Sequence, residues 1–172
     1  MAVTQFNLNP GQRAERKLLI TVAEWTDGSS QVREILGTRT EDSSIDYNPD
    51  IETTTDILGI NYTDMNRTQP QQDFDPFLIL GGSKLGAKLN DIRRRNALSE
   101  LNQFTVYIIT AFAGSAGAYE AEKHTACTIA YNSIGGDTNV NFPISVYYSN
   151  NITTGTVDKL ADDFVFTADT NI

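Results

Sequence analysis

Alternating apolar and polar residues predict a β-hairpin over residues 119–148. In its first strand Cys127, Ile129 and Tyr131 fall on one face and His124 falls on the other, because successive side chains of a strand point to opposite sides. The segment 133–137, Ser-Ile-Gly-Gly-Asp, is typical of a turn, and the returning strand alternates again. The hairpin therefore has one apolar face and one small, nearly uncharged face, on which His124 is a surface or interface histidine.

Apolar runs on both sides of this hairpin predict further strands. Residues 17–25 alternate as the first convincing strand, and residues 103–112 are apolar on both faces, which is typical of a central buried strand. The other predicted strands are 32–36 with a polar continuation through Gly37 over 38–44, an extended polar run over 60–72, a short strand that starts at 155, and 163–167.

One helix is predicted at residues 84–98. Leu85, Leu89 and Ile92 recur at helical spacing, and Ser83 in front of them is a favourable N-cap. The helix therefore buries one apolar stripe against a sheet. Altogether the sequence predicts seven or eight strands and one helix.

The opposite face of this helix is strongly cationic. Against Asp91 it carries five cations, a net charge of +4: Lys84, Lys88, Arg93, Arg94 and Arg95. Three interpretations are open. The face can bind phosphate, it can be a solvated face whose cations suit the carboxyl end of the helix dipole, or its arginines can pair with acidic loops of a neighbouring copy.

Residues 45–59 are acidic and rich in threonine, and they predict a long hairpin excursion away from the body. The carboxylates in and just before this loop are Asp42, Asp46, Asp50, Glu52 and Asp56. They lack the glycine of a D-x-D-x-D-G loop, so a solvated acidic loop is favoured over a calcium site. The polar run 60–72 suits a sheet with one wet face or an edge that pairs with another chain.

Composition and charge narrow the classes of function. The 172 residues, 40% of them hydrophobic, fit one core-forming domain, and we divide the chain into an N-terminal arm (1–16) and a single β domain (17–172). Thirteen basic and 22 acidic residues give a net charge of −9, which repels nucleic acid. A sequence-reading DNA-binding protein is therefore disfavoured.

The amino-terminal segment carries no apolar core, and no apolar run approaches the roughly 18 residues of a membrane span. We therefore expect a soluble protein in a cytoplasm-like compartment, without a membrane anchor.

Residues that could carry catalysis are scarce. Cys127 and His124 are the single cysteine and histidine, which excludes an internal disulfide and a Cys/His zinc site, and we expect a buried, inert thiol. The sequence contains no nucleophile elbow, P-loop or dinucleotide fingerprint. Glu120 and Glu122 share a strand face, but alternating surface charge accounts for them. We expect no catalytic residue, cofactor or metal, and hence no enzyme.

These features follow one another in a particular order over about residues 15–168. A strand, the acidic excursion and a polar strand that ends at 69–76 (QPQQDFDP) precede the helix, the buried strand and the glycine hairpin; 153–158 (TTGTVD) and a last strand close the chain. This order resembles the major tail proteins, or tail tube proteins, of long-tailed bacteriophages. The resemblance lies in arrangement and texture, without an invariant motif.

The resemblance implies a β-sandwich or barrel with a flanking helix, whose copies form hexameric rings that stack into a hollow tube. In such proteins two hairpins from each subunit join those of its neighbours in a continuous inner β-barrel, which leaves no free sheet edges. Here these hairpins would be 37–44 with 60–72, and 119–132 with 139–148. The loop 45–59 and the N-terminal arm would contact the next ring.

DNA passes through the lumen of such a tube during ejection into the host, and an acidic or neutral lining lets it slide, because phosphate binding depends on cations. The lumen-lining candidates are Asp64, Glu120, Glu122, Thr128 and Asn141. The inter-subunit candidates are Asp46, Asp50, Glu52, Arg93, Arg94 and Arg95.

The resemblance also implies a virion protein that is assembled in the bacterial cytoplasm, with a tape measure protein, a tail terminator and baseplate or tail-tip proteins as partners. Three alternatives stay open: the tube subunit of a contractile tail, a head-decoration protein, and a carbohydrate-binding β-sandwich module. The last would need exposed aromatic residues grouped on one face, and the candidates Tyr47, Tyr62 and Tyr147 are spread over different elements.

Overall fold

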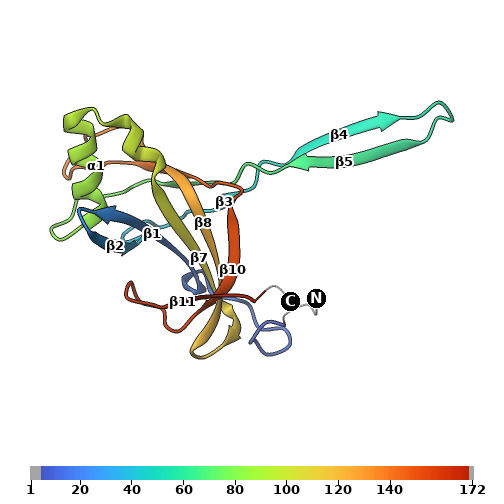
Figure 1. Cartoon of the computed structure of the whole chain (residues 1–172), viewed down its shortest axis with the longest axis horizontal. Helices are drawn as coiled ribbons and strands as arrows, with labels where there is room; N and C mark the ends of the chain where they lie inside the picture. Colours follow the sequence, from blue (N-terminus) through green and yellow to red (C-terminus); the bar gives the residue numbers. More distant parts are fainter. Residues whose placement is uncertain (1–4, 171–172) are drawn as a thin grey trace.

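The computed structural model describes residues 5–170, which form a mainly β structure with one α-helix (Figure 1). This confirms the predicted fold class, although eleven strands are present instead of seven or eight. The elements are β1 (Leu19–Asp27), β2 (Ser30–Ile35), β3 (Ile45–Asp46), β4 (Asp50–Thr55), β5 (Asn61–Arg67), β6 (Gln71–Phe74), α1 (Lys84–Arg95), β7 (Phe104–Ser115), β8 (Ala118–Tyr131), β9 (Ile144–Tyr147), β10 (Ile152–Val157) and β11 (Phe166–Ala168), with short 3₁₀ helices η1 (Arg16–Leu18) and η2 (Leu98–Asn102).

Nine of these strands belong to one antiparallel sheet in the order β2-β1-β7-β8-β9-β6-β3, with β10 paired to β8 and β11 to β10. The long strand β8 holds the sheet together, because its first half pairs with β7 and β10 and its last residues pair with β9. Among the strands of residues 5–170, β4 and β5 pair only with each other. They project away from the body of the molecule (Figure 1).

Two apolar clusters cover the two faces of the central strands. The larger cluster joins β1, β7, β8, β6 and β9 to helix α1, whose Leu85, Leu89 and Ile92 are fully buried as predicted. The smaller one packs Tyr107 of β7 against Phe164, with ring centroids 4.9 Å apart. Strand β7 is therefore buried on both faces, which confirms its prediction as the central strand.

A β-bulge in β8 overturns the predicted position of His124. Val106 pairs with His124 while Phe104 pairs with Cys127, so β8 carries one extra residue here, and Ala126 adopts a φ of 57°. The extra residue reverses the alternation, and His124 points to the same side as Cys127. His124 is only 2% exposed, so the prediction of a surface or interface histidine is wrong. Cys127 is buried as expected, and burial raises the pKa of its thiol.

The region 37–59 also differs from its prediction. Residues 38–44 form no strand, because Gly37 and Arg39 take positive φ angles and Thr40 N donates to Gly37 O in a turn. The segment 45–59, predicted as a long hairpin excursion, contains β3 and β4, and β4 forms the first strand of the projecting hairpin. Its threonines agree with this, since β-branched residues favour extended backbone. The projecting hairpin is thus β4 with β5, and the predicted pairing of 37–44 with 60–72 is wrong.

Two predicted elements, the helix and the returning strand of the hairpin, are longer than the observed ones. The helix ends at Arg95 instead of 98, because Asn96 takes a left-handed conformation with φ 53° and its N–H bonds to the carbonyls of Arg93 and Ile92. The returning strand of the hairpin is confined to β9, and residues 132–143 form a wide loop in which Gly135 pairs with Asn141.

Phe6 and Asn7 of the N-terminal arm lie against the end of β7. Asn7 N donates to Phe112 O at 3.0 Å, and Phe6 packs edge-on against Phe112 with ring centroids 5.4 Å apart. Residues 1–4 of this arm lie outside the described residues. Within residues 5–170 there is no helix of the length and apolarity that a membrane crossing requires.

The amino end of α1 is capped by two side chains, of which sequence reasoning found one. Ser83 Oγ accepts from Gly86 N at 3.2 Å, as predicted, and the Glu34 carboxylate on β2 accepts from Lys84 N and Leu85 N at 2.5 and 2.7 Å. Glu34 therefore ties the helix to the sheet edge and supplies negative charge at the positive end of the helix dipole.

We expect Glu34→Ala to lower the free energy of unfolding by about 2 kcal/mol, because two backbone N–H groups lose a charged acceptor. Glu34→Gln keeps one acceptor oxygen and is expected to lose roughly half as much. Urea denaturation followed by circular dichroism measures both. Equal stability of Glu34→Ala and the wild type would show that this carboxylate does not hold the helix.

Candidate assembly surface

The β4–β5 hairpin (residues 50–67) is the most exposed element of the described chain. Every residue of β4 and of β5 is exposed to solvent, and the hairpin leaves the body as a long two-stranded projection (Figure 1). A two-stranded hairpin is marginally stable on its own. This one is anchored at its base, where Gln69 N donates to Tyr47 O at 2.9 Å and Asn48 Nδ2 donates to Gln69 O at 3.1 Å.

The register gives the hairpin two different faces. On one face Ile51 and Met65 lie opposite each other, followed by paired threonines and by Thr55, whose hydroxyl donates to Asn61 Oδ1 at 2.6 Å. On the other face Glu52 lies directly opposite Asp64. Like charges at such a position are destabilising, and Asn66 Nδ2 offsets this cost in part by donating to Glu52 Oε2 at 3.3 Å. One face is thus uncharged and the other acidic.

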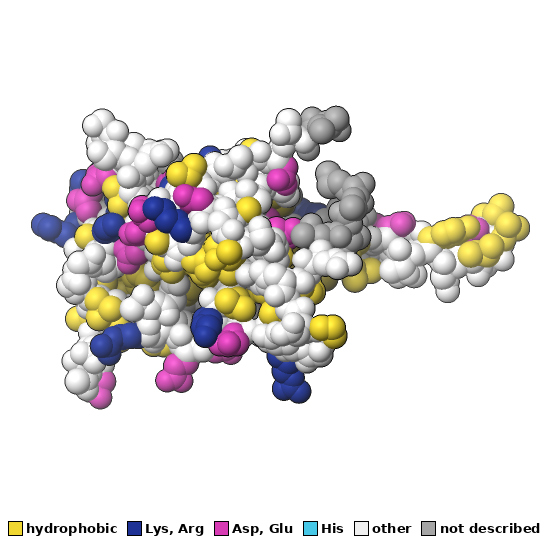
Figure 2. All heavy atoms as spheres, turned by 90° about the horizontal axis from the view of Figure 1, so that it is seen from below, with side chains coloured by type: hydrophobic (Ala, Val, Ile, Leu, Met, Phe, Trp, Pro, Cys, Tyr) yellow, Lys and Arg dark blue, Asp and Glu magenta, His cyan; other side chains and the backbone are white. Residues whose placement is uncertain are grey.

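The tip of the hairpin (residues 56–60) presents apolar side chains to water. Ile57 and Leu58 are 102% and 78% exposed, and the tip is apolar in the space-filling view (Figure 2). Asp56 holds the turn, because its Oδ1 accepts from Leu58 N and Ile60 N at 2.8 and 2.9 Å and its Oδ2 accepts from Tyr62 Oη. These hydrogen bonds, the one from Ile60 N first, lower the pKa of Asp56. The tip is therefore ordered although it has no core beneath it.

The structure separates the lumen-lining candidates. Asp64 lies on the projecting hairpin, while Glu120 and Glu122 lie half-buried on β8 between β7 and β10. Glu122 Oε2 lies 3.2 Å from His124 Nε2. Thr128 follows the β-bulge, so it points to the opposite side of the sheet from the two glutamates.

Asn141 has a structural position. It lies in the loop before β9, where its Oδ1 accepts from Phe77 N at 2.9 Å and its Nδ2 donates to Asp75 Oδ1 at 2.9 Å. This side chain therefore links the loop before β9 to the segment that contains Asp75 and Phe77. The prediction that Asn141 lies on a strand face is wrong.

The inter-subunit candidates fall into two groups at different places. Asp46 is exposed on β3, and Asp50 and Glu52 lie on β4, where Asp50 Oδ2 is 3.6 Å from Arg67 Nε. The arginines belong to the last turn of α1.

Within the described residues, Arg95 is bound by its own chain while Arg93 and Arg94 form no ion pair. Arg95 pairs with Asp91 at 2.7 Å and with Glu100 at 2.9 Å, so it links the helix to η2. Arg93 donates to Asn90 Oδ1, and no carboxylate of residues 5–170 pairs with Arg93 or Arg94. Two of the three arginines are thus available to a partner.

Glu100 gives a pH-dependent prediction. Hydrogen bonding by Arg95 and then by Lys88 lowers the pKa of Glu100 to about 2, from an ordinary value of 4.5. Because the folded-state pKa is depressed, ionised Glu100 stabilises the native state above pH 4.5, and this contribution is lost as the pH falls from 4.5 towards 2. An NMR titration of the Glu100 carboxyl is expected to show a midpoint near 2, and Arg95→Gln is expected to raise it. A midpoint near 4.5 in the wild type would contradict this interpretation.

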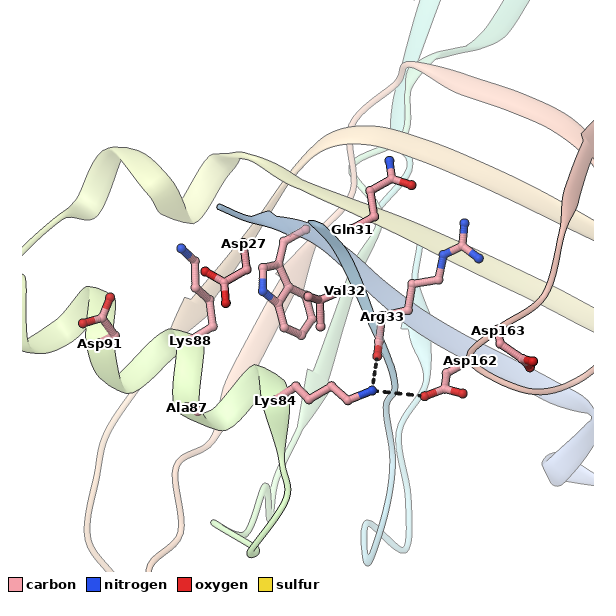
Figure 3. Close-up of a pocket in the computed structure, with 11 residues that line it drawn as sticks. Asp27, Gln31, Val32, Arg33, Lys84, Ala87, Lys88, Asp91, Asp162 and Asp163 are labelled. Atoms are coloured by element: carbon pink, nitrogen blue, oxygen red, sulfur yellow. Dashed lines mark hydrogen bonds and ion pairs between the residues drawn. The ribbon is translucent and has the colours of Figure 1, made fainter. Parts of the chain in front are cut away.

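A groove of about 940 Å³ lies between β2, α1 and residues 162–163. Figure 3 shows that cations and carboxylates are mixed along it, with Lys84 Nζ 3.4 Å from Asp162 Oδ2. Lys88, at its other end, lies 2.9 Å from Glu100. Since acidic groups of the same chain engage both lysines, the groove lacks the concentrated positive charge that phosphate recognition requires.

Elsewhere in the described part of the chain, titratable groups do not converge into a metal centre. No group of three or more histidine, cysteine, aspartate or glutamate side chains in residues 5–170 has the geometry to hold a metal ion. The features that stand out chemically are therefore surfaces: a two-faced hairpin with an apolar tip, and the cationic end of α1.

The fold and these surfaces define a small, mainly β protein with one helix and a projecting two-stranded hairpin. No protein-family model matches the chain, and no curated protein matches it. Among solved structures, one chain of the "Cryo-EM structure of the anti-feeding prophage (AFP) baseplate, 6-fold symmetrised" is similar to it, with a TM-score of 0.43 and 8% sequence identity over 78% of this chain and 91% of that chain. The function is therefore inferred from the residues of this chain.

Proposed function

We propose that this chain is a structural, non-enzymatic virion protein that self-assembles into the tail tube of a long-tailed bacteriophage. The β4–β5 hairpin is the single observation that carries this proposal. An ordered projection without a core of its own, ending in bare Ile57 and Leu58, exposes apolar surface that monomeric proteins avoid. Burial of this apolar surface against another copy of the chain is the simplest way to remove it from water.

Charge supports a tube that conducts DNA without binding it. The chain has a net charge of −9, and Glu120 and Glu122 share one face of β8. A lumen lined by such carboxylates repels phosphates, so DNA slides through it. The order of sequence features adds the expectation of hexameric rings that stack, together with tape measure, terminator and baseplate or tail-tip partners.

Electron microscopy of the purified protein tests the proposal most directly. We expect negative-stain images of concentrated protein to show hollow tubes or stacked rings, and sedimentation velocity to show a mass that grows with concentration. In the same samples a gel-shift assay with duplex DNA at moderate salt is expected to show no binding. A compact monomer at every concentration would refute the proposal.

A further inference from the structure

An apolar groove lies between the amino end of α1 and two neighbouring loops. Its volume is about 350 Å³, and its lining includes Ile79, Ala87, Asn90, Ile134 and Val140. Ile79, Ile134 and Val140 are 41%, 47% and 49% exposed. This groove therefore offers apolar surface that the chain itself leaves partly uncovered, and none of the described residues that line it is charged.

The hairpin tip has the matching properties. It is apolar, because Ile57 and Leu58 project from it, and it is held in one conformation by the hydrogen bonds of Asp56. Ordering a loop in its bound conformation before it binds removes part of the entropic cost of binding. The tip is thus preorganised to enter an apolar recess.

The tip and the groove cannot meet within one molecule. Helix α1 lies at one end of the long axis, and the hairpin tip lies at the other (Figure 1). A contact between two such different surfaces on different copies is heterologous, and heterologous contacts repeat from copy to copy as rings or open stacks. The contact therefore suits an assembly that grows in one direction.

Charge complementarity favours the same partner. Residues 50–67 hold four carboxylates and one arginine, a net charge of −3, whereas α1 has a net charge of +4. Arg94 stands one turn beyond Asn90 of the groove on the same face of the helix. Opposite charges beside an apolar contact steer the encounter and set its orientation.

We propose that the groove beside α1 receives the β4–β5 hairpin tip of a second copy of this chain, with Ile57 and Leu58 against Ile134 and Val140 and the acidic hairpin beside Arg93 and Arg94. This contact rests on the proposed self-assembly and specifies which two surfaces meet.

Charge-introducing variants on both sides of the contact test it. Ile57→Asp/Leu58→Asp alters the tip, Ile134→Asp/Val140→Asp alters the groove, and Val165→Asp is the matched control at a residue that is 62% exposed elsewhere. We expect tip and groove variants to keep the wild-type unfolding midpoint and to raise the concentration needed for assembly by about 100-fold or more, because two apolar side chains lose their burial. The control is expected to assemble like the wild type.

A disulfide trap locates the contact independently of assembly yield. A chain with Leu58→Cys is mixed with one that carries Ala87→Cys in the groove, and the control pair replaces the second with Glu41→Cys, another exposed position outside the groove. Buried Cys127 stays in place. Mild oxidation is expected to link residues 58 and 87 between chains and to leave the control pair unlinked, since a disulfide requires Cα atoms within about 7 Å.

The outcomes separate this contact from the proposed function. If the wild type assembles but the groove variant assembles equally well and residues 58 and 87 do not link, the tip docks elsewhere and the contact is refuted while self-assembly stands. If the wild type remains monomeric at every concentration, both proposals fail. Loss of assembly in both variants together with the 58–87 link supports the contact.

Discussion

Replacing residues 49–67 by an Asn-Gly turn is expected to leave a folded subunit that no longer polymerises at any attainable concentration. The chain ends at this cut are already joined, because Gln69 N donates to Tyr47 O and Asn48 Nδ2 donates to Gln69 O. A two-residue Asn-Gly loop closes such an antiparallel pair without strain. Since every residue of β4 and β5 is exposed, the body loses little buried surface.

Sedimentation and negative-stain microscopy measure the assembly of this variant, and thermal unfolding measures its stability. The boundaries of this deletion are chosen to keep β3, which pairs with Gln71 and Gln72 of β6. Removal of 45–59 instead would delete β3 and would leave β5 without its partner strand. The double variant Ile51→Thr/Met65→Thr is a milder companion that keeps the hairpin and alters only its uncharged face. Normal tubes from the shortened chain would contradict an assembly role for the hairpin.

Arg33→Leu is expected to lower the free energy of unfolding by about 3–5 kcal/mol, because it leaves a buried carboxylate without its counterion. Glu24 on β1 is only 5% exposed, and Arg33 Nε lies 2.5 Å from its Oε2. The guanidinium also donates to Phe164 O at 2.5 Å and stacks 4.3 Å from the centre of the Phe164 ring. Arg33 thus joins β2 to the segment that covers the smaller apolar cluster.

Tyr107 reports on the same buried site. Its hydroxyl donates to Glu24 at 3.3 Å, and burial, followed by the charge of Glu24, raises the pKa of Tyr107 to about 12.

Urea denaturation measures the stability of Arg33→Leu, and Glu24→Gln/Arg33→Leu is the control, which is expected to recover most of the loss because no isolated charge remains. If the single variant loses less than about 1 kcal/mol, the pair is not a stabilising buried ion pair.

Local sequence signals predicted the elements whose pattern depends on near neighbours. The stripe of Leu85, Leu89 and Ile92 specifies one face of a helix, and the apolar run of β7 specifies a strand buried on both sides. Ser83 was recognisable as an N-cap from its position alone. Glu34 was not, because the hydrogen bond that its carboxylate accepts from Lys84 N joins residues 50 positions apart in the sequence.

The wrong predictions for β8 arose because one extra residue reverses the orientation of the side chains that follow it in the strand. Alternation through β8 placed His124 opposite Cys127, but the bulge at Ala126 reverses the faces. The same reversal separates Thr128 from Glu120 and Glu122 among the lumen-lining candidates. Ala126 with a positive φ has no signature in the sequence, since alanine rarely adopts that conformation.

For the candidate surface, the sequence showed that an acidic excursion leaves the body near residues 45–59 and that cations gather on α1. It could not show which residues pair across the excursion, so the uncharged and acidic faces of the β4–β5 hairpin came only from the register. The sequence also could not show which of the three arginines pairs within its own chain. The structure shows that Arg95 does so, because it binds Asp91 and Glu100 of η2.

The amino-acid sequence by itself determined a mainly β chain with one amphipathic helix and an acidic balance, because these properties depend on composition and on spacings of a few residues. Tertiary structure alone decided the sheet order, the burial of His124 and the groove formed by α1 with the loops around Ile79 and Ile134. Those features join residues that are far apart in the chain, and their contacts form only when the whole sheet has closed around its core.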